Sequence, residues 1–581
     1  MGLDFLDRLN PYGCNILDIT NTDLCKACIF NTEAKRFYTY ERVEHGEVKC
    51  TASNDDDGRL FLGWSLFKLF IATGVCLIID KLSISPQHGD KFRGLHNTWN
   101  RTFTQVFNDH SKRFKINQLY GNPTILELAC HFKGSLDFNH ILYAPDGSPL
   151  LTAAEFLDRI PQYIKETRQK HNNADRCVYS NANYILLALF IEEVSGQQFD
   201  IFLKENIFDP LKMNQTHMRR EQLSSTTSVQ QRAQPYIASS NGYRHKVPEC
   251  CLTSFADSVE RAVTGGYISA GDLAIFLDNI FKNLDNEDES IDAPLGKPIV
   301  DSLFTGVGTL SGDRTQPHGY TKVGMRTTLD RNFAGMHSLN RLISSGAKSS
   351  KETIGRPPDG EKPLEAFYIA GCGTGWAHSV YLIPTRRVYV FVLTNTTSAV
   401  DMSDIVSRMY VQQTCDLLPP ALIETGAIDQ WDQDTLLKRR GEYCESLARQ
   451  MRIENMPALL MVELQDAAMD TPNAEHANII GQYQNSKSRQ VLTIVNLDDE
   501  NPDGRLGIRF TGGTKSSSLM RFIRTGEGYR TCSSSPGTDV LPVDRLGAWK
   551  TVEFDFNTQN GQVVSLTRQG LYLDDVFTRI G

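Results

Sequence analysis

The feature that most constrains this chain is an apolar run near its start, "FLGWSLFKLFIATGVCLII", from Phe61 to Ile79. A run of this kind belongs either in a protein core or in a bilayer. Its longest uncharged piece, Leu69 to Ile79, is well short of the roughly 20 residues that cross a bilayer. We therefore expect a buried helix that begins at Ser65.

The same run carries one serine and one lysine, Ser65 and Lys68, three residues apart. On a helix, residues with this spacing share a face and their side chains can meet. Burial disfavours the charged form of a lysine and moves its pKa toward neutrality. A neutral lysine beside a serine hydroxyl is a general base beside a nucleophile, a known variant of serine-hydrolase chemistry. The S-x-x-K spacing also arises by chance, so this stretch alone leaves a structural lysine open.

Composition argues against several other functions. The 581 residues are 40% hydrophobic and 22% charged, and the formal net charge of −9 argues against a nucleic-acid-binding surface. We expect a small molecule as the partner, with no nucleic acid and no membrane, and leave the oligomeric state open. The N-terminal "MGLDFLDRLNPYG" has two aspartates and no apolar core of signal-peptide length, so we expect a cytoplasmic protein.

The thirteen cysteines form no disulfide framework, and we expect reduced, mostly buried thiols. Cys25 and Cys28 form a lone C-x-x-C with neither a second pair nor a suitably spaced histidine. A metal or redox site would need such a partner, which favours chance spacing. We therefore expect no metal and no cofactor.

Further along the chain, several segments have recognisable patterns. "YSNANYILLALFIEEVSGQQF", from Tyr179, has the apolar spacing of a helix that Ser180 or Asn181 caps and Gly196 ends. "GGYISAGDLAIFLDNIF", from Gly265, predicts a tight glycine turn followed by a helix. "AFYIAGCGTGWAHSVYLIP" and "RVYVFVLTNT" predict strands, the second of them buried.

The C-terminal part has a different pattern. Near Ile423 a polar helical connector begins, and from about Ile479 short alternating segments follow, such as "QVLTIVNL", "RLGIRF" and "TVEFDF". Glycine, aspartate and serine turns separate these segments. This arrangement predicts a small antiparallel barrel or sandwich.

Taken in order, these segments resemble the motifs of the serine β-lactamase and penicillin-binding-protein-like superfamily, specifically its class C and esterase branch. The elements that carry the resemblance are Ser65-x-x-Lys68, the Tyr179-Ser180-Asn181 helix, the turn at Gly265, and "PTILELACHFKG" with Thr124, Leu128, His131 and Gly134 in register. The resemblance covers roughly residues 25 to 420. It implies an α/β (α+β) β-lactamase/transpeptidase-like fold over residues 1–425, with an antiparallel sheet flanked by helices and an all-helical region. Residues 426–478 would be the helical connector, and residues 479–581 a lipocalin-like β-barrel domain.

The resemblance also implies roles for particular residues. Ser65 would be the nucleophile that forms an acyl-enzyme, and Lys68 would take or share its proton. Tyr179 would act as a phenolate-like base, and Asn181 would hydrogen-bond Lys68 or the substrate. Without the family context, Tyr179 reads as an ordinary half-buried aromatic residue and Asn181 as a helix cap. We expect His131 to pack under the site as a structural residue.

The third family motif, K-T-G or H-x-G on a strand beside the site, is where the chain departs from the pattern. Counting back from Pro384 without gaps places Ile369-Ala370-Gly371 on this motif. No ionisable group remains there to hold a substrate carboxylate, which argues against a true β-lactamase or peptidase.

The backbone of this strand can still serve the reaction. The N–H groups of Ser65 and Cys372 could form an oxyanion hole, which needs no particular side chain. We expect Gly371, Cys372, Trp376 and His378 to line the substrate site. His378 would replace the missing motif side chain only if the strand register were shifted.

These observations predict a serine hydrolase (esterase) or acyltransferase that works through a Ser65 acyl-enzyme. Its substrate would be an ester, thioester or amide of a small, largely apolar molecule, with an acyl donor thioester as one candidate. The likeness of the third motif to fungal-type members points toward secondary-metabolite biosynthesis, as in the acyltransferases of polyketide tailoring, although fold does not fix function. The competing hypothesis is a non-hydrolytic cyclase or isomerase, or a substrate-binding pseudoenzyme, on the same scaffold.

Overall fold

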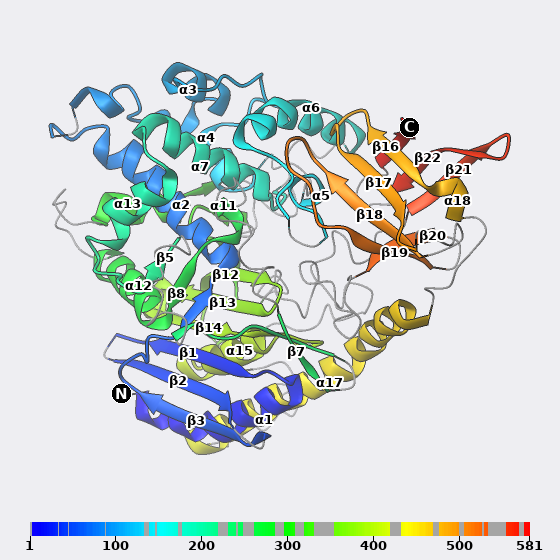
Figure 1. Cartoon of the computed structure of the whole chain (residues 1–581). Helices are drawn as coiled ribbons and strands as arrows, with labels where there is room; N and C mark the ends of the chain where they lie inside the picture. Colours follow the sequence, from blue (N-terminus) through cyan, green and yellow to red (C-terminus); the bar gives the residue numbers. More distant parts are fainter. Residues whose placement is uncertain are drawn as a thin grey trace. The chain divides into compact units, whose positions relative to one another are not determined.

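The computed structural model gives the arrangement of helices and strands along the chain (Figure 1). It describes residues 3–32, 34–43, 46–87, 89–132, 139–145, 148–171, 177–218, 231–239, 242–247, 261–284, 295–307, 319–330, 354–358, 360–418, 432–468, 476–498, 505–525, 528–532, 554–568 and 575–580. The chain forms two compact units, each assembled from separated stretches. Unit 1 comprises Met1–Trp99, Ser195–Lys246 and Val263–Ala458, and unit 2 comprises Asn100–Val194, Val247–Ala262 and Leu459–Gly581.

Unit 1 is built on a nine-stranded antiparallel sheet. In spatial order its strands are β3 (Val48–Ser53), β2 (Lys35–Arg42), β1 (Leu24–Phe30), β14 (Val388–Thr394), β13 (Trp376–Ile383), β12 (Glu365–Gly373), β11 (Met325–Thr328), β10 (Gly319–Thr321) and β9 (Gly306–Val307). Every residue of β13 and β14 is buried. A strand that is covered on both faces has no polar face, which explains the continuous apolar sequence of β14.

Helical elements cover both faces of this sheet. α1 (Asn10–Thr20) packs on β2 and β3, and α15 (Met402–Thr414) packs on β1, β13 and β14. Ser379 of β13, which pairs with Ala370, hydrogen-bonds Ser403 and Ser407 of α15. On β12, Gly371 follows Ala370 and faces the short helix η3 (Trp64–Phe67) instead of α15. Because neighbouring residues of a strand point to opposite faces, α15 and η3 lie on opposite sides of the sheet.

The apolar run forms a continuous helical segment that begins one residue before Ser65. η3 continues into α2 (Lys68–Cys76) and then into a π-helical turn, η4 (Leu77–Leu82). All residues of α2 are buried, so the predicted buried helix is confirmed. None of the described helices combines the length and the apolar character that crossing a bilayer requires.

Two small sheets complete the strands of unit 1. One has the order β4 (Leu60–Leu62), β8 (Tyr267–Ser269), β5 (Thr216–His217), and the other β15 (Thr396–Thr397), β6 (Tyr236–Ala238), β7 (Arg244–Lys246). The predicted glycine turn and helix are confirmed, except that β8 separates the turn from α12 (Ala270–Leu284). Unit 1 also contains all or part of the following described helical elements: η1 (Leu3–Leu9), η5 (Gly89–Phe92), η6 (Thr98–Asn100), α8 (Phe199–Leu203), η7 (Lys204–Phe208), α11 (Arg261–Thr264), α13 (Lys297–Phe304), η9 (Pro384–Arg386) and α17 (Gln433–Ala468).

Unit 2 combines a group of helices with the C-terminal strands. Its helices are α3 (Phe103–His110), α4 (Ile125–Ala129), α5 (Asn139–Leu142), α6 (Ala153–His171) and most of α7 (Asn181–Ser195), as the sequence predicts for α7. Thr124 caps α4 through a capping box with Glu127. Of the "PTILELACHFKG" residues, Gly134 lies outside the described residues.

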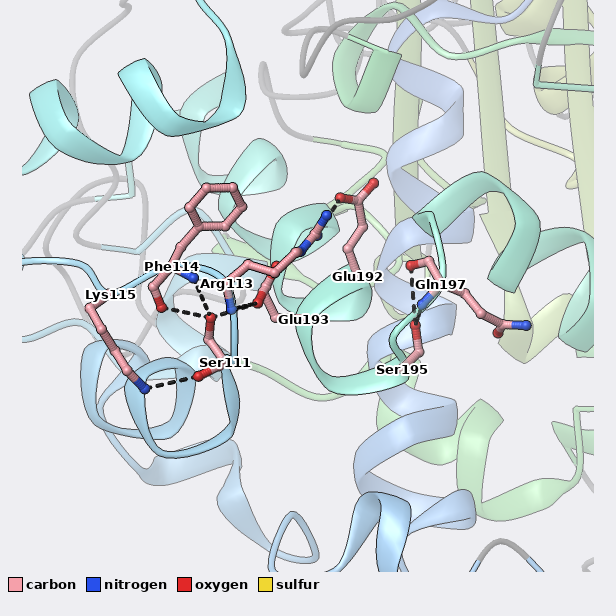
Figure 2. A network of polar contacts seen from close by, with 8 residues as sticks. All are labelled: Ser111, Arg113, Phe114, Lys115, Glu192, Glu193, Ser195 and Gln197. Atoms are coloured by element: carbon pink, nitrogen blue, oxygen red, sulfur yellow. Dashed lines mark hydrogen bonds and ion pairs between the residues drawn. The ribbon is translucent and has the colours of Figure 1, made fainter.

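A buried carboxylate ties α7 to the turn that follows α3 (Figure 2). Glu193 accepts hydrogen bonds from Ser111 Oγ (2.6 Å), the Arg113 amide (3.1 Å) and Arg113 Nε (2.6 Å). Burial raises the pKa of Glu193, but these donors outweigh it and lower that pKa overall. The carboxylate is therefore ionised and holds the C-terminal end of the Tyr179 helix in place.

The C-terminal strands close into a barrel, as the sequence predicts. Its strands are β16 (Gly481–Asn485), β17 (Val491–Asn496), β18 (Leu506–Thr511), β19 (Met520–Thr525), β20 (Gly528–Cys532), β21 (Phe554–Gln559), β22 (Gln562–Arg568) and β23 (Asp575–Arg579), preceded by α18 (His476–Ile479). Ala144 and Leu150, far earlier in the chain, belong to the barrel's apolar core. The predicted boundary after residue 425 lies outside the described residues, and the division at 425 and 478 stays a prediction.

The paired cysteines of "CKAC" cannot act together. Cys25 and Cys28 are both buried in β1, three residues apart, so their side chains point to opposite faces of the sheet. Cys25 pairs with Tyr40 and Cys28 with Phe37 on the neighbouring strand. Two thiols on opposite faces cannot bind one metal ion.

Candidate active site

Ser65 lies in a tight turn between β4 and α2. The Gly63 amide donates to the Gly266 carbonyl (2.8 Å), and the Leu66 amide donates back to the Gly63 carbonyl (3.1 Å). Between them, Trp64 has a backbone φ of 47°, in the left-handed region that residues other than glycine seldom adopt. Ser65 itself is half-buried, so its hydroxyl remains within reach of a substrate.

Lys68 and Ser65 meet as the S-x-x-K spacing predicts. Lys68 Nζ lies 2.8 Å from Ser65 Oγ. The Lys68 residue is only 5% exposed, and burial lowers the pKa of its amine to about 7. An ammonium group would donate to the hydroxyl, whereas the neutral amine can accept the hydroxyl proton. Near pH 7 both forms are present, which is the condition that a general base requires.

Two glycines of β12 let this strand approach the Ser65 turn closely. A Cβ on Gly371 would lie 2.5 Å from the Gly63 carbonyl oxygen and 2.9 Å from Leu66 Cγ. A Cβ on Gly373 would lie 2.1 Å from the Trp64 ring. No side chain fits at either position, so the backbone of β12 packs directly against η3.

A second pair of glycines, in the turn before β8, supports the other side of the Ser65 turn. A Cβ on Gly265 would meet the Phe67 ring at 2.6 Å and the Trp64 carbonyl oxygen at 2.8 Å, and Gly265 has a φ of 71°. A Cβ on Gly266 would lie 2.3 Å from the His217 carbonyl oxygen. The glycine turn that the sequence predicts therefore packs against the Ser65 turn.

The motif residues of β12 divide between the two faces of the sheet. Ile369 shares the η3 face with Gly371 and is 9% exposed. That it occupies the position of the third family motif stays a prediction. Cys372 points to the opposite face, and burial together with Asp401 raises the pKa of its thiol. Its thiol is therefore a poor nucleophile, although the charge of Lys68 offsets part of the rise in its pKa.

Trp376 and His378 lie behind β4. Both belong to the η3 face of β13, where Trp376 pairs with Gly373 and His378 with Gly371. They are 0% and 1% exposed, and both rings contact Phe61 at centroid distances of 6.0 and 6.3 Å. Both side chains are therefore packed under β4, and that they contact a substrate stays a prediction.

Tyr179 and Asn181 belong to unit 2. The Tyr179 ring packs on His131 with a centroid distance of 4.5 Å, and the Ser180 amide donates to His131 Nδ1 (3.0 Å). His131 therefore supports the Tyr179 segment, as expected of a structural histidine, and it does so with a left-handed backbone (φ 52°). Tyr179 and Asn181 are both half-buried, and Asn181 is the first residue of α7. That they act together with Ser65 stays a prediction.

The sequence does not reveal the residues that shape the turn. No sequence pattern predicts the left-handed backbone of Trp64, and none predicts the hydrogen bond of His378 with the Leu62 carbonyl (2.8 Å). The glycine at position 63 directly before Trp64 is the signal that could have indicated a tight turn. Among the described residues, no group of three or more His, Cys, Asp or Glu is placed to hold a metal ion.

Comparisons with known proteins identify the family of this chain, through a match that begins after Ser65 and Lys68. A family model described as Beta-lactamase matches residues 108–409, which include Tyr179, Asn181 and the β12–β13 hairpin. Penicillin-binding protein 4* of Bacillus subtilis is 45% identical over 47 residues, 8% of this chain and 10% of that protein, so the match spans about a tenth of the curated relative.

Solved structures resemble the chain at low sequence identity. The octameric penicillin-binding protein homologue from Pyrococcus abyssi is 15% identical, with 99% of this chain and 100% of that chain covered and a TM-score of 0.48. A class C beta lactamase from Rhodobacter sphaeroides is 14% identical, with coverages of 70% and 97% and a TM-score of 0.47.

Proposed function

Because this chain belongs to the Beta-lactamase family, we propose that it forms an acyl-enzyme at Ser65 and passes the acyl group to water or to an acceptor alcohol or amine. The observation that carries the proposal is the 2.8 Å contact between Ser65 Oγ and the amine of Lys68, whose pKa burial lowers to about 7. A structural lysine more often lies on a solvated surface. A buried amine beside a reachable hydroxyl fits a base beside its nucleophile.

The proposed steps follow from this pair. The Ser65 hydroxyl proton passes to the neutral Lys68 amine while Oγ bonds to the substrate carbonyl carbon and an electron pair moves onto the carbonyl oxygen. The C=O bond then re-forms, and the leaving group departs with the proton from the Lys68 ammonium. Water or an acceptor reverses the sequence and frees Ser65. The backbone N–H groups of Ser65 and Cys372 would stabilise the oxyanion, and the close packing of β12 on η3 supports that role.

The character of β12 supports an apolar acyl substrate. Ile369 provides no charge to hold a carboxylate, so we propose an ester, thioester or amide of a small, largely apolar molecule, with esterase or acyltransferase activity rather than β-lactam hydrolysis. Tyr179 would share proton transfer with Lys68, and Asn181 would hydrogen-bond Lys68 or the substrate. We place this activity in the cytoplasm, because the cysteines of the described residues are free thiols, and in secondary-metabolite biosynthesis by analogy with fungal-type members.

The test is covalent labelling of Ser65. A fluorophosphonate probe and an activated acyl thioester should each add one group by intact mass, and Ser65→Ala should abolish both adducts. Ser83→Ala should leave both adducts unchanged. This serine directly follows the same helical segment and donates to the Ile79 carbonyl (2.6 Å). The labelling rate should rise with pH through about 7 and then level off, because only neutral Lys68 accepts the proton.

Two outcomes would overturn the proposal or part of it. If the wild type forms no adduct, the chain is better described as a cyclase, isomerase or binding protein on this scaffold. If Ser65 is labelled but Lys68→Met keeps the wild-type rate, the base is another group. We expect Lys68→Met to lower the rate by about 10²- to 10⁴-fold, the usual contribution of a general base.

A further inference from the structure

β4, the strand that precedes Ser65, is an edge strand of its small sheet, so only one of its two edges pairs with another strand of that sheet. β4 pairs with β8 through Phe61 and Ile268, and the Gly63 amide bonds Gly266 on the same side. Because strand carbonyls alternate in direction, the carbonyls of Leu60 and Leu62 point away from β8. The Leu60 carbonyl accepts from the Ala233 amide (3.0 Å).

The Leu62 carbonyl is served by a side chain from another sheet. His378 of β13 places its Nε2 2.8 Å from this oxygen. Leu62 is 5% exposed, so a carbonyl left there without a donor would lose the hydrogen bonds that water would otherwise provide. The bond fixes the chain three residues before the nucleophile.

Both nitrogens of His378 have polar neighbours. The Thr394 amide lies 3.3 Å from Nδ1 and the Ala377 carbonyl also hydrogen-bonds the ring, and we assign the proton to Nε2 because this tautomer can accept from Thr394 and donate to Leu62. Burial lowers the pKa of His378 to about 4, so the ring stays neutral in this tautomer at ordinary pH. The ring therefore links Thr394 in the centre of the nine-stranded sheet to Leu62 at the end of β4.

We propose that His378 is a positioning residue for the Ser65 nucleophile, acting through the Leu62 carbonyl. This inference rests on the proposed function. The Ser65 turn packs against glycines of β12 and of the turn before β8. Since β4 directly precedes this turn in the chain, the position of Leu62 determines where Ser65 Oγ lies relative to Lys68. Misplacement of a reacting group by about 1 Å can cost about 10²-fold in rate.

Three substitutions separate the two hydrogen bonds of the ring. His378→Gln keeps an amide N–H as many bonds from Cβ as Nε2, so it can still donate to Leu62. His378→Asn keeps an acceptor at the place of Nδ1, so it can still receive the Thr394 amide but cannot reach Leu62. His378→Phe keeps the flat ring beside Phe61 and removes both bonds.

The measurement is the second-order rate of Ser65 labelling by the fluorophosphonate probe, together with its pH profile and the free energy of unfolding. We expect about 10- to 100-fold slower labelling for His378→Asn and His378→Phe, and a rate near wild type for His378→Gln. The pH midpoint near 7 should stay in place in all three, because Lys68 is untouched. The same change at another buried histidine, His476→Phe in α18, serves as the control and should leave labelling unchanged.

The outcomes separate this inference from the proposed function. A wild type that is not labelled overturns both. A labelled wild type with His378→Phe at the wild-type rate overturns only the role of His378. That role is also overturned if His378→Gln and His378→Asn are slowed equally, in step with their loss of stability, since a merely structural histidine would behave in that way. If His378→Phe does not fold, the comparison of His378→Gln with His378→Asn decides alone.

Discussion

At the scale of single residues, Lys68, which we propose as the general base, has a cost to stability. Its burial lowers the pKa of the amine to about 7, from an ordinary value of 10.5. The property that makes the residue a base at neutral pH is the same property that destabilises the folded state whenever the amine is charged. An enzyme with this arrangement gives up stability for reactivity at one position.

The sign of this effect gives a prediction for Lys68→Met. Below pH 7, Lys68 is charged in both states and the folded protein bears the full desolvation penalty. Between about pH 7 and 10.5 the unfolded chain binds more protons, so the free energy of unfolding rises with pH. Methionine has no such penalty, so Lys68→Met should be more stable than wild type by a few kcal/mol at pH 6, with a smaller gain at pH 9. Urea denaturation at both pH values measures this gain, and a gain independent of pH would contradict the assignment.

At the scale of elements, the site depends on how closely three backbones approach. η3 is in close contact with β12 at Gly371 and with the turn before β8 at Gly265. Neither position has room for a Cβ. The contact on Gly371 is mainly with backbone, which cannot move aside as a side-chain tip can. The separation of β12 from η3 is therefore set by glycine.

Gly371→Ala tests this packing. The added Cβ would lie 2.5 Å from the Gly63 carbonyl oxygen, so β12 and η3 must separate. We expect labelling of Ser65 to slow by about 10²-fold and the free energy of unfolding to fall by about 1–3 kcal/mol. Gly507→Ala in β18 is the matched control, because its new Cβ would meet the side-chain tips of Leu497 (2.8 Å) and Leu519 (3.0 Å). Equal labelling rates for Gly371→Ala and wild type would show that the close approach is not needed.

At the scale of the whole molecule, the barrel is not a separate appendage. Within unit 2, a Cβ on Gly512 would lie 2.1 Å from the Leu150 carbonyl oxygen, and the Thr514 amide donates to Glu155 of α6 (2.8 Å). Arg159 of the same helix bonds the Ser488 carbonyl (2.9 Å). The barrel core is completed by residues of the helical part, so the two fold as one unit.

Leu150→Asp should therefore destabilise the barrel although it lies outside the barrel strands. Leu150 is fully buried in the barrel core, so a carboxylate at this position would have no water to solvate its charge. We expect a loss of at least about 3 kcal/mol in the free energy of unfolding and faster hydrogen exchange in β16–β23. Ile453→Asp, at a side chain that is 74% exposed, is the control and should change stability by less than about 0.5 kcal/mol. Unchanged exchange in the barrel strands would contradict the shared core.

Much of this could be predicted from the sequence because local patterns determine it. Spacing and periodicity predict the Tyr179 helix, the alternating C-terminal strands and the meeting of Ser65 with Lys68, whereas the resemblance to a family was needed to favour a catalytic lysine over a structural one. The role of His378 could not be predicted, because its partner Leu62 lies more than 300 residues earlier in the chain. The same holds for Leu150 in the barrel core. Contacts between distant segments leave no periodic signal in either segment.

The pairing of β1 with β14 has a consequence for how the protein is made. Cys25 lies opposite Thr394, and Leu150 packs in a barrel whose last strand ends at Arg579. During synthesis β1 cannot pair with β14 until Thr394 has been made, and the core of unit 2 is complete only when the last barrel strand has been made. β2 can pair with one edge of β1 early, but the other edge of β1 stays without β14 for much of translation, and an unpaired strand edge is prone to aggregation. A stop codon late in the message would remove barrel strands that enclose Ala144 and Leu150, so it would damage parts of the protein that were made first.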